Sequence, residues 1–309
     1  MKTISKLIFL TLLVVSFSIN KVVAQADRDS STTFFYIITN SGGEFIGTII
    51  SQNAKEVLIN TRDRGQVSIP KYEIKEMKEV NPNEMTIKGN YIPEEVFSTR
   101  YFITTNALPI KKGENYVLWS LYGPEVQFGV GENLGLGIMT SWVGMPVIGT
   151  AKYSIKLTET TSVGVGTLLG TGSWAAPDVA IALPFGALTI GNRRANINFS
   201  GGYGVVAYDN KSEGKALFSV AGMAKIGKKV SIVFDSFIVP NIFYSTYIYD
   251  NITNTSTVVT KRSPLIVFLP GIRVQGNNNS AFQFGFAGAY GNGEMVPIPI
   301  PMLQWFRKF

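Results

Sequence analysis

The chain has 309 residues, of which 45% are apolar, 12% are aromatic and only 16% are charged, with 31 glycines. Soluble domains carry about 25% charged residues, so this mixture is unusual for one, although it leaves a large soluble β-protein open. The chain contains no cysteine and no histidine. Their absence excludes disulfides and thiol nucleophiles and removes the commonest general base and the commonest transition-metal ligand.

Residues 1–24 are predicted to be a signal peptide. Lys2 and Lys6 give a positive start, and the apolar run at residues 7–19 is shorter than the ~20 residues of a spanning helix. Small residues allow cleavage after Ala24 or Ala26, and a retained membrane anchor is the alternative. Cleavage at residue 24 leaves 25 basic and 21 acidic residues, a charge of +4, which does not favour nucleic acid as a partner. We therefore expect an exported protein.

Residues 30–82 are predicted to form a small SH3-like or Sm-like β domain. Turn sequences such as NSGG and TRDRG separate five short runs of strand-type residues. These runs are residues 34–39, 45–50, 57–60, 66–69 and 74–80. The last run also fits a helical turn, because Ile74, Met77 and Val80 recur at helical spacing. Residues 25–100 carry 11 acidic and 9 basic residues, which favours an adaptor or spacer over an RNA-binding domain.

Residues 83–95 are predicted to be a linker and residues 96–309 an outer-membrane β-barrel. Apolar residues such as Ile197 and Phe199 alternate with small or polar ones such as Asn198, and a period of two indicates strands. Aromatic residues stand near the ends of the strands: Tyr116, Trp142 and Trp305. An outward apolar band around a lumen of small and polar residues is typical of a transmembrane antiparallel β-barrel. The predicted fold class is therefore all-β.

Tight polar connections alternate with longer ones along this part of the chain. The tight connections are residues 129–133, 158–161, 191–195, 227–229 and 275–279. Barrels of this kind have short periplasmic turns and longer outer loops. The pattern predicts about twelve strands, the first at about residues 97–107. With an even number of strands, the chain enters and leaves the barrel on the same side, which we expect to be the periplasm, and the N-terminal domain lies there too. The last strand is expected to close the barrel, with three residues facing lipid: Leu303, Trp305 and Phe309.

Several charged residues fall on the lumen side of the predicted strands. They are Glu125, Lys152, Lys156, Lys225 and Asp235. Ion pairs that balance charge within a narrow barrel are the favoured interpretation, and a Ser–Lys or paired-carboxylate site stays open. We expect no enzymatic activity, no cofactor and no metal. Four basic residues are placed in outer loops, near lipopolysaccharide phosphates, with solvated loop charge as the alternative: Lys211, Lys215, Lys261 and Arg262.

Two segments carry a resemblance to a known family. TRYFITTNALPIKKGENYV (residues 99–117) and IPIPMLQWFRKF (residues 298–309) are similar to sequences of a family of uncharacterised outer-membrane β-barrels from Gram-negative bacteria. Members have a signal peptide, an Sm-like N-terminal segment, an entry to the barrel resembling ALPLKKGEGYY, and a terminal phenylalanine. The resemblance implies an outer-membrane location and a barrel fold, without an activity. Phe309 also resembles the signal that the barrel-insertion machinery reads.

The sequence leads to two functional hypotheses. The first is a non-enzymatic accessory or structural subunit of an envelope complex, whose N-terminal module docks a periplasmic partner. The alternative is a small passive pore for ions or small solutes. The expected partners are outer-membrane lipid and lipopolysaccharide, the barrel-insertion machinery and an unidentified periplasmic or outer-membrane protein.

Overall fold

The computed structural model describes residues 33–81, 84–85, 90–175, 178–209, 211–250, 255–276, 279–292, 294–295 and 299–309. The chain divides into two compact units, Met1–Asn90 and Tyr91–Phe309. The predicted signal peptide, residues 1–24, lies outside the described residues. Within the described ranges, no helix combines the length and the apolar character that membrane crossing requires.

The first unit contains a five-stranded antiparallel sheet in the order β4-β3-β2-β1-β5. Its elements are β1 (Phe34–Thr39), β2 (Glu44–Gln52), β3 (Glu56–Thr61), β4 (Gly65–Pro70), the 3-10 turn η1 (Lys71–Glu73) and β5 (Ile74–Val80). Ile37, Val57, Ile59 and Ile69 form its buried core. All five predicted runs lie on strands, which confirms the small β domain. β5 is a strand and not a helical turn, because it pairs with β1 along its length.

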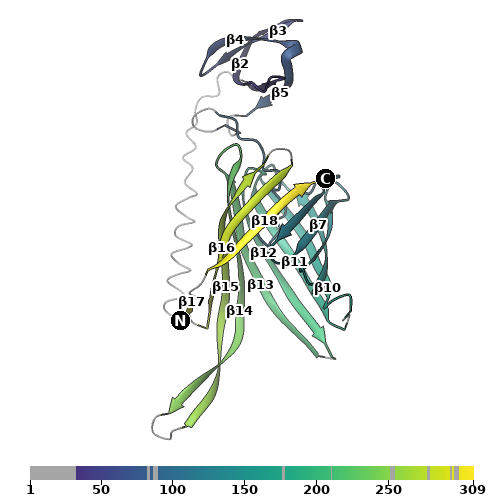
Figure 1. Cartoon of the computed structure of the whole chain (residues 1–309), viewed down its shortest axis with the longest axis vertical. Coiled ribbons are helices and arrows are strands. Elements are labelled where there is room, and N and C mark those ends of the chain that lie inside the picture. Colours follow the sequence, from purple (N-terminus) through teal and green to yellow (C-terminus); the bar gives the residue numbers. More distant parts are fainter. Residues whose placement is uncertain are drawn as a thin grey trace. The chain divides into compact units, whose positions relative to one another are not determined.

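The second unit is a closed antiparallel β-barrel of twelve strands (Figure 1). The first six are β6 (Tyr116–Ser120), β7 (Pro124–Gly129), β8 (Leu134–Thr140), β9 (Val147–Lys156), β10 (Thr161–Thr171) and β11 (Ala180–Gly191). The others are β12 (Ala195–Tyr208), β13 (Lys211–Lys225), β14 (Val230–Asp250), β15 (Thr255–Gln275), β16 (Ser280–Gly291) and β18 (Ile300–Lys308). Pairing of β18 with both β16 and β6 closes the ring, and the two-residue β17 (Glu294–Met295) pairs with β16 outside it.

The predicted first strand at residues 97–107 is wrong. These residues form turns and one isolated bridge between Arg100 and Thr105, and most of them are buried. The count of twelve is nevertheless confirmed, because β6 and β7 form a separate short hairpin. The backbone groups of residues 97–107 bond to inward-pointing side chains of the barrel wall. Among the described residues, they do not pair with the backbone of a barrel strand in the way that a strand of the sheet would.

The outer face of the barrel is apolar, as the alternation predicts. Large apolar side chains at alternate positions are exposed, among them Leu134, Leu136, Ile138, Tyr153, Ile155, Ile190, Ile197, Phe199, Ile232, Phe234, Ile272, Val274, Phe284, Phe286 and Trp305. Their inward-facing neighbours, such as Asn198 and Gln283, are buried. Tyr116 differs from the prediction: it faces inward and packs with Phe97 and Phe306 instead of joining an outer girdle. A closed sheet satisfies its own backbone, so this outer band can face hydrocarbon.

The strands are unequal in length, so the barrel has an asymmetric rim. β14 and β15 have 21 residues each, whereas β6 has 5. Figure 1 shows the β14–β15 hairpin extending well beyond the other strands, at the end of the barrel opposite to the C-terminus. The end near the C-terminus carries the tight connections.

Candidate functional site in the barrel lumen

Residues 95–110 lie inside the barrel, and we call them the plug. Eleven of them are buried: Glu95, Phe97, Ser98, Thr99, Arg100, Tyr101, Phe102, Asn106, Ala107, Leu108 and Ile110. A buried segment with little secondary structure must find other partners for its backbone N–H and C=O groups. In this protein, inward-pointing side chains of the barrel wall supply them.

Asp235 of β14 holds the tip of the plug. Its Oδ2 accepts hydrogen bonds from the backbone N–H groups of Ile103 and Thr104, both at 2.8 Å, and its Oδ1 accepts one from Thr104 Oγ1 at 2.7 Å. Asp235 is completely buried. Three donors to one carboxylate compensate for its removal from water.

Arg273 of β15 binds the other arm of the plug. Its Nη1 donates to Phe97 O and its Nη2 to Arg100 O, both at 2.6 Å. Its Nε donates to Gln283 Oε1 at 2.7 Å, and its guanidinium stacks over the Phe306 ring at 4.7 Å. Arg273 is fully buried, and it fills the space between plug and wall. Its fork of donors suits this role, because it reaches several acceptors at once.

Two glutamines extend this network across neighbouring strands. Gln283 Nε2 donates to Tyr101 O at 3.3 Å and to Gln304 Oε1 at 2.9 Å. Gln304 Nε2 then donates to Phe102 O at 2.6 Å. The wall of β15, β16 and β18 therefore binds plug carbonyls where a strand partner would otherwise do so.

An apolar layer lies beside these polar contacts. Plug residues Tyr101 and Phe102 form a buried cluster with wall residues, namely Ala221, Met223, Val233, Leu269 and Met302. The Phe102 ring lies directly over the paired glycines Gly271 and Gly285, where a Cβ would come within 2.4 and 2.7 Å of the ring. The prediction of a lumen with only small or polar residues is therefore wrong on this side, because the wall packs against a folded segment and not against water.

The opposite wall binds the plug through Lys152 of β9. Its Nζ donates to Asn106 O at 2.7 Å, Thr105 Oγ1 at 3.1 Å and Leu108 O at 3.3 Å. Ala107 N donates to Thr189 Oγ1 of β11 at 2.7 Å. These contacts fix the returning arm of the plug to strands far from Arg273.

Two ion pairs also join the plug to the wall. Arg100 of the plug pairs with Glu125 of β7, and Lys225 of β13 lies 3.6 Å from Glu95. The side chains of Lys225 and Glu95 are both fully buried. Glu95 also accepts a hydrogen bond from Ser231 Oγ at 2.5 Å. Removing one member of such a buried pair leaves an uncompensated charge, so these pairs hold the plug in one register.

Four of the five predicted lumen charges lie in the lumen and contact the plug: Glu125, Lys152, Lys225 and Asp235. Lys156 is exposed and pairs with Glu159 at 2.7 Å in the turn after β9. Sequence reasoning missed Arg273, although Ile272 and Val274 on either side identify it as inward-facing. It does not identify Glu95 and Arg100 either, because the sequence predicts a linker at residues 83–95 and a strand at residues 97–107.

A clamp of charged residues lies at the end of the plug. Glu114 Oε1 and Oε2 accept hydrogen bonds from Arg193 Nη1 and Nη2 at 2.8 and 2.9 Å, and Lys308 Nζ lies 3.0 Å from Oε1. Burial raises the pKa of Glu114. The Arg193 hydrogen bonds and charge, the Lys111 N–H and the Lys308 charge lower it by more, so that the pKa falls to about 2. This carboxylate joins the β11–β12 turn to the last strand.

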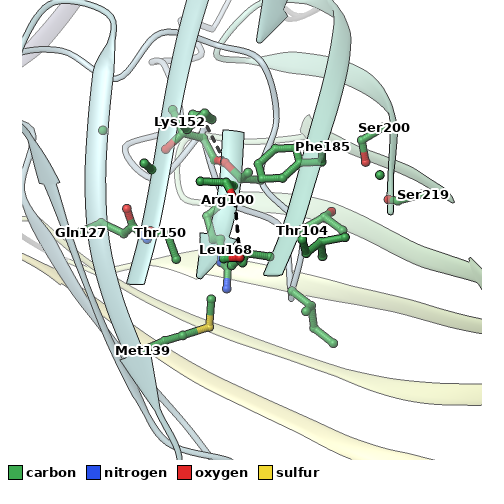
Figure 2. Close-up of a pocket in the computed structure, with 18 of the residues that line it drawn as sticks. Arg100, Thr104, Gln127, Met139, Thr150, Lys152, Leu168, Phe185, Ser200 and Ser219 are labelled. Atoms are coloured by element: carbon green, nitrogen blue, oxygen red, sulfur yellow. Dashed lines mark hydrogen bonds between the residues drawn. The ribbon is translucent and has the colours of Figure 1, made fainter. Parts of the chain in front are cut away.

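A cavity of about 210 Å³ lies between the plug and the strands from β7 to β14. In Figure 2 Arg100 stands at the centre of the view, with Gln127 and Thr150 to one side and Phe185 and Ser200 to the other. Its lining combines polar groups with large inward apolar side chains: Met139, Leu168, Leu183, Phe185, Leu217 and Phe237. Met139 and Leu183 stand near the strand ends that carry the long connections. The cavity therefore extends from the end of the long connections to Gly135, next to the tight turn before β8.

The seam of the barrel runs along β18. Trp305 pairs with Trp119 of β6 and with Phe282 of β16, and its side chain is exposed on the outer face. Leu303 lies on the same face and is half-buried. Phe309 N donates to Asn115 O at 3.3 Å, and the exposed Phe309 ring meets Phe128 edge-on, with centroids 6.1 Å apart. The terminal residue is thus bonded across the seam.

The predicted lipopolysaccharide contacts lie on strands and not in loops. Lys211 and Lys215 lie in the first five residues of β13, and Lys261 and Arg262 lie in the first half of β15. All four are exposed, and the Arg262 guanidinium lies 4.8 Å from the centre of the Phe243 ring. Lys211 and Lys215 lie opposite Tyr208 and Gly204 of β12, and Lys261 and Arg262 lie opposite Tyr244 and Phe243 of β14.

No group of three or more Asp or Glu residues with the geometry to hold a metal ion occurs among the described residues. Among the described residues, the buried carboxylates Glu95, Glu125 and Asp235 take part in the plug contacts above, and Glu114 binds Arg193 and Lys308. The fold and the lumen together define a transmembrane β-barrel of the outer-membrane class with an internal plug. The closed strand ring and the outward apolar band carry this assignment.

Comparison with known proteins adds no family. No family model matches the chain, and no curated protein matches it. Among solved structures, the NanC porin is similar with 11% identity and a TM-score of 0.40, over 63% of this chain and 98% of that one. The CymD monoaromatic hydrocarbon channel is similar with 9% identity and a TM-score of 0.32, over 63% of this chain and 87% of that one. The Ralstonia pickettii toluene transporter TbuX is similar with 11% identity and a TM-score of 0.22, over 90% of this chain and 88% of that one.

Proposed function

We propose that this protein is an outer-membrane channel for small solutes whose lumen is narrowed by the plug. The observation that carries the proposal is the cavity of about 210 Å³ inside the barrel, beside the plug. Barrels of 8 strands are filled by their own side chains, whereas those of 16–18 strands leave an aqueous channel. A barrel of twelve strands lies between these cases, and here the plug and the cavity together occupy its interior.

The plug determines how solutes would pass. It bonds to wall residues on several sides, including Asp235, Arg273 and Lys152. Hydrogen bonds to charged groups contribute about 1.5–3 kcal/mol each, so complete withdrawal of the plug is a rare event. The channel is therefore expected to conduct weakly, with openings that depend on local displacement of the plug.

Single-channel recording of the purified full chain in planar bilayers tests this function. We expect small, reproducible openings, together with swelling of liposomes in small uncharged solutes such as glycerol. A protein that is folded by heat-modifiability on gels but shows neither conductance nor swelling above empty liposomes would overturn the proposal. Absence of conductance and swelling with the Asp235→Ala variant, whose plug tip is loosened, would overturn it as well.

The accessory-subunit hypothesis ranks second. It rests on the separate five-stranded unit, Met1–Asn90, which a simple pore does not require. No contact among the described residues identifies a partner for that unit, so its docking role and its SH3-like or Sm-like character stay predictions. Affinity purification from detergent extracts with and without residues 30–82 would test it, since a specific envelope partner should be lost with the domain.

The orientation follows from the same proposal. With twelve strands, the chain enters the barrel before β6 and leaves it after β18 at the same end, which is the end of the tight turns. We place this end and the first unit in the periplasm, and the β14–β15 hairpin at the cell surface. Lys261 and Arg262 would then contact lipopolysaccharide phosphates, and the double change to glutamine should reduce the lipopolysaccharide that copurifies with the barrel.

A further inference from the structure

Arg100 of the plug lines the cavity and carries a buried donor that has no acceptor in the described part of the chain. Its Nη2 pairs with Glu125, but its Nε–H is buried and has no hydrogen-bond partner among the described residues. Arg100 is more than nine-tenths buried and lines the cavity. A buried N–H without an acceptor destabilises the folded state, because it has lost its water and gained nothing. Ser219 Oγ, on another lining residue, is buried without a partner in the same way.

The charges that line the cavity do not balance. Arg100 and Lys152 are cations, and Glu125 is the only acid among the residues that line it. Lys152 Nζ is bound by three neutral oxygens, and none of the ion pairs among the described residues includes it. Buried cations are stabilised by a nearby anion. A small monoanion would complement Lys152, the cation of the lining that has no acid partner among the described residues.

The rest of the lining suits a hydrocarbon body. Met139, Leu168, Phe185 and Phe237 enter the lumen from four different strands, and Ile103 faces them from the plug. Figure 2 shows Leu168 and Phe185 beside Arg100, so the apolar wall and the unpaired donor belong to one site. An apolar cavity of about 150 Å³ accommodates benzene. A cavity of about 210 Å³ therefore has room for a ring of that size with one small polar group.

We propose that this cavity binds small monocarboxylates with an apolar body about the size of a benzene ring. The carboxylate binds the Arg100 guanidinium and lies in the field of Lys152, while the body packs against Leu168 and Phe185. The inference deepens the proposed function, because it names the solute class of the same lumen. Benzoate is the probe that combines the two halves of the site.

Equilibrium dialysis of labelled benzoate against the full chain in detergent micelles tests the site. Benzoate should bind at least tenfold more tightly than benzyl alcohol, which lacks the charge, and than acetate, which lacks the body. Arg100→Lys keeps the cation and removes the planar guanidinium, and Leu168→Trp fills the apolar half from β10 without touching a plug contact. Each should weaken benzoate binding at least tenfold, whereas Lys156→Gln, on the exposed end of β9, should bind as the wild type does.

The outcomes separate this site from the channel. Equal binding of benzoate and benzyl alcohol, or wild-type binding by folded Leu168→Trp protein, would overturn the inference. Glycerol-driven liposome swelling is measured in parallel. Swelling without benzoate binding refutes the site and leaves the channel standing, whereas benzoate binding without swelling or conductance supports the site and refutes the channel. Heat-modifiability on gels verifies that each variant is folded.

Discussion

Asp235 on β14 accepts both the backbone N–H and the side-chain hydroxyl of Thr104, which lies 131 residues earlier in the chain. The same carboxylate accepts the N–H of Ile103. These three bonds place the tip of the plug beside the cavity, since Ile103 and Thr104 both line it. In the proposed channel, we therefore expect the stability of this contact to control how often the lumen is narrowed.

Asp235→Ala should loosen the plug tip without opening the barrel. The change leaves two part-buried N–H groups and one hydroxyl without an acceptor, and a lost bond to a charged group costs about 1.5–3 kcal/mol. In planar bilayers we expect the ratio of open to closed time to rise about tenfold or more. Asp235→Asn keeps an acceptor oxygen and should give an intermediate value.

Asp63→Ala is the matched control, because Asp63 is an exposed carboxylate in the first unit. It should conduct as the wild type does. If the Asp235→Ala protein is folded and its open fraction is unchanged, the plug tip does not control conductance.

A disulfide should lock the plug to the wall. A Cβ at Gly164 of β10 would lie 3.4 Å from Ala107 Cα, which is close enough for a bridge between cysteines at the two positions. The chain has no other cysteine, so Ala107→Cys with Gly164→Cys gives one possible intramolecular bond. We expect oxidation to reduce conductance and liposome swelling, and reduction to restore both.

Each single cysteine variant controls for the substitution itself, since neither can form the bridge within one chain. Conductance that is equal before and after reduction of a fully formed disulfide would show that solutes pass without movement of residues 105–110.

The barrel wall could be predicted from the sequence because its environment repeats. Every second residue of β12 meets lipid, so Ile197 and Phe199 differ regularly from Asn196 and Asn198. The plug has no such repeat. Phe97 contacts Tyr116 and Phe306, whereas Phe102 contacts glycines of β15 and β16. These partners are distant in sequence, so a local pattern at residues 97–107 reads as a strand.

The sequence predicts the charged wall residues of the candidate site but not its plug residue or its apolar lining. Inward parity identified Glu125 and Lys152 on the wall, because a charge between two outward apolar residues must face the lumen. It could not identify Arg100, whose role comes from a pair with Glu125 in a segment without periodicity. The apolar residues Leu168 and Phe185 also belong to the inner face, where the rule of a polar lumen excluded them.

Glu114 should make the barrel sensitive to strong acid. Its pKa of about 2 in the folded state lies below the ordinary value of 4.5. The stabilisation is therefore fully present above about pH 4.5 and is lost as the pH falls towards 2. A shift of this size corresponds to about 3 kcal/mol, at 1.36 kcal/mol per pKa unit. Urea unfolding followed by tryptophan fluorescence measures it.

Glu114→Gln is the comparison for this pH effect. The difference in unfolding free energy between wild type and Glu114→Gln should shrink between pH 4.5 and pH 2. Lys156→Gln, which removes an exposed pair with Glu159, should show no such pH-dependent difference. A constant difference between wild type and Glu114→Gln across this range would mean that the carboxylate does not depend on Arg193 and Lys308.

Peptide tags test the orientation of the barrel. A tag inserted after Thr257, in the extended part of β15, should be reached by antibody on intact cells. A tag after Ala26 should be reached only after the outer membrane is permeabilised. Labelling of the N-terminal tag on intact cells would reverse the orientation.

The last prediction concerns the seam at Phe309. Its N–H bonds to Asn115 O, and its ring packs on Phe128 at the end of β7, so the terminal residue ties the last strand to the first hairpin. Deleting Phe309 should leave export and the first unit intact but lower the amount of heat-modifiable barrel in outer-membrane fractions. Phe309→Trp keeps an aromatic ring at the membrane interface and should assemble.

Phe309→Asp places a charge at that interface and should assemble poorly, even though its backbone N–H can still bond to Asn115. Comparing it with the deletion separates the ring from the backbone bond. If only the deletion fails, the bond across the seam is what matters, and if both fail while Phe309→Trp assembles, an uncharged ring is needed at this position. Wild-type amounts of folded barrel in both variants would show that Phe309 has no part in closing the barrel or in its insertion.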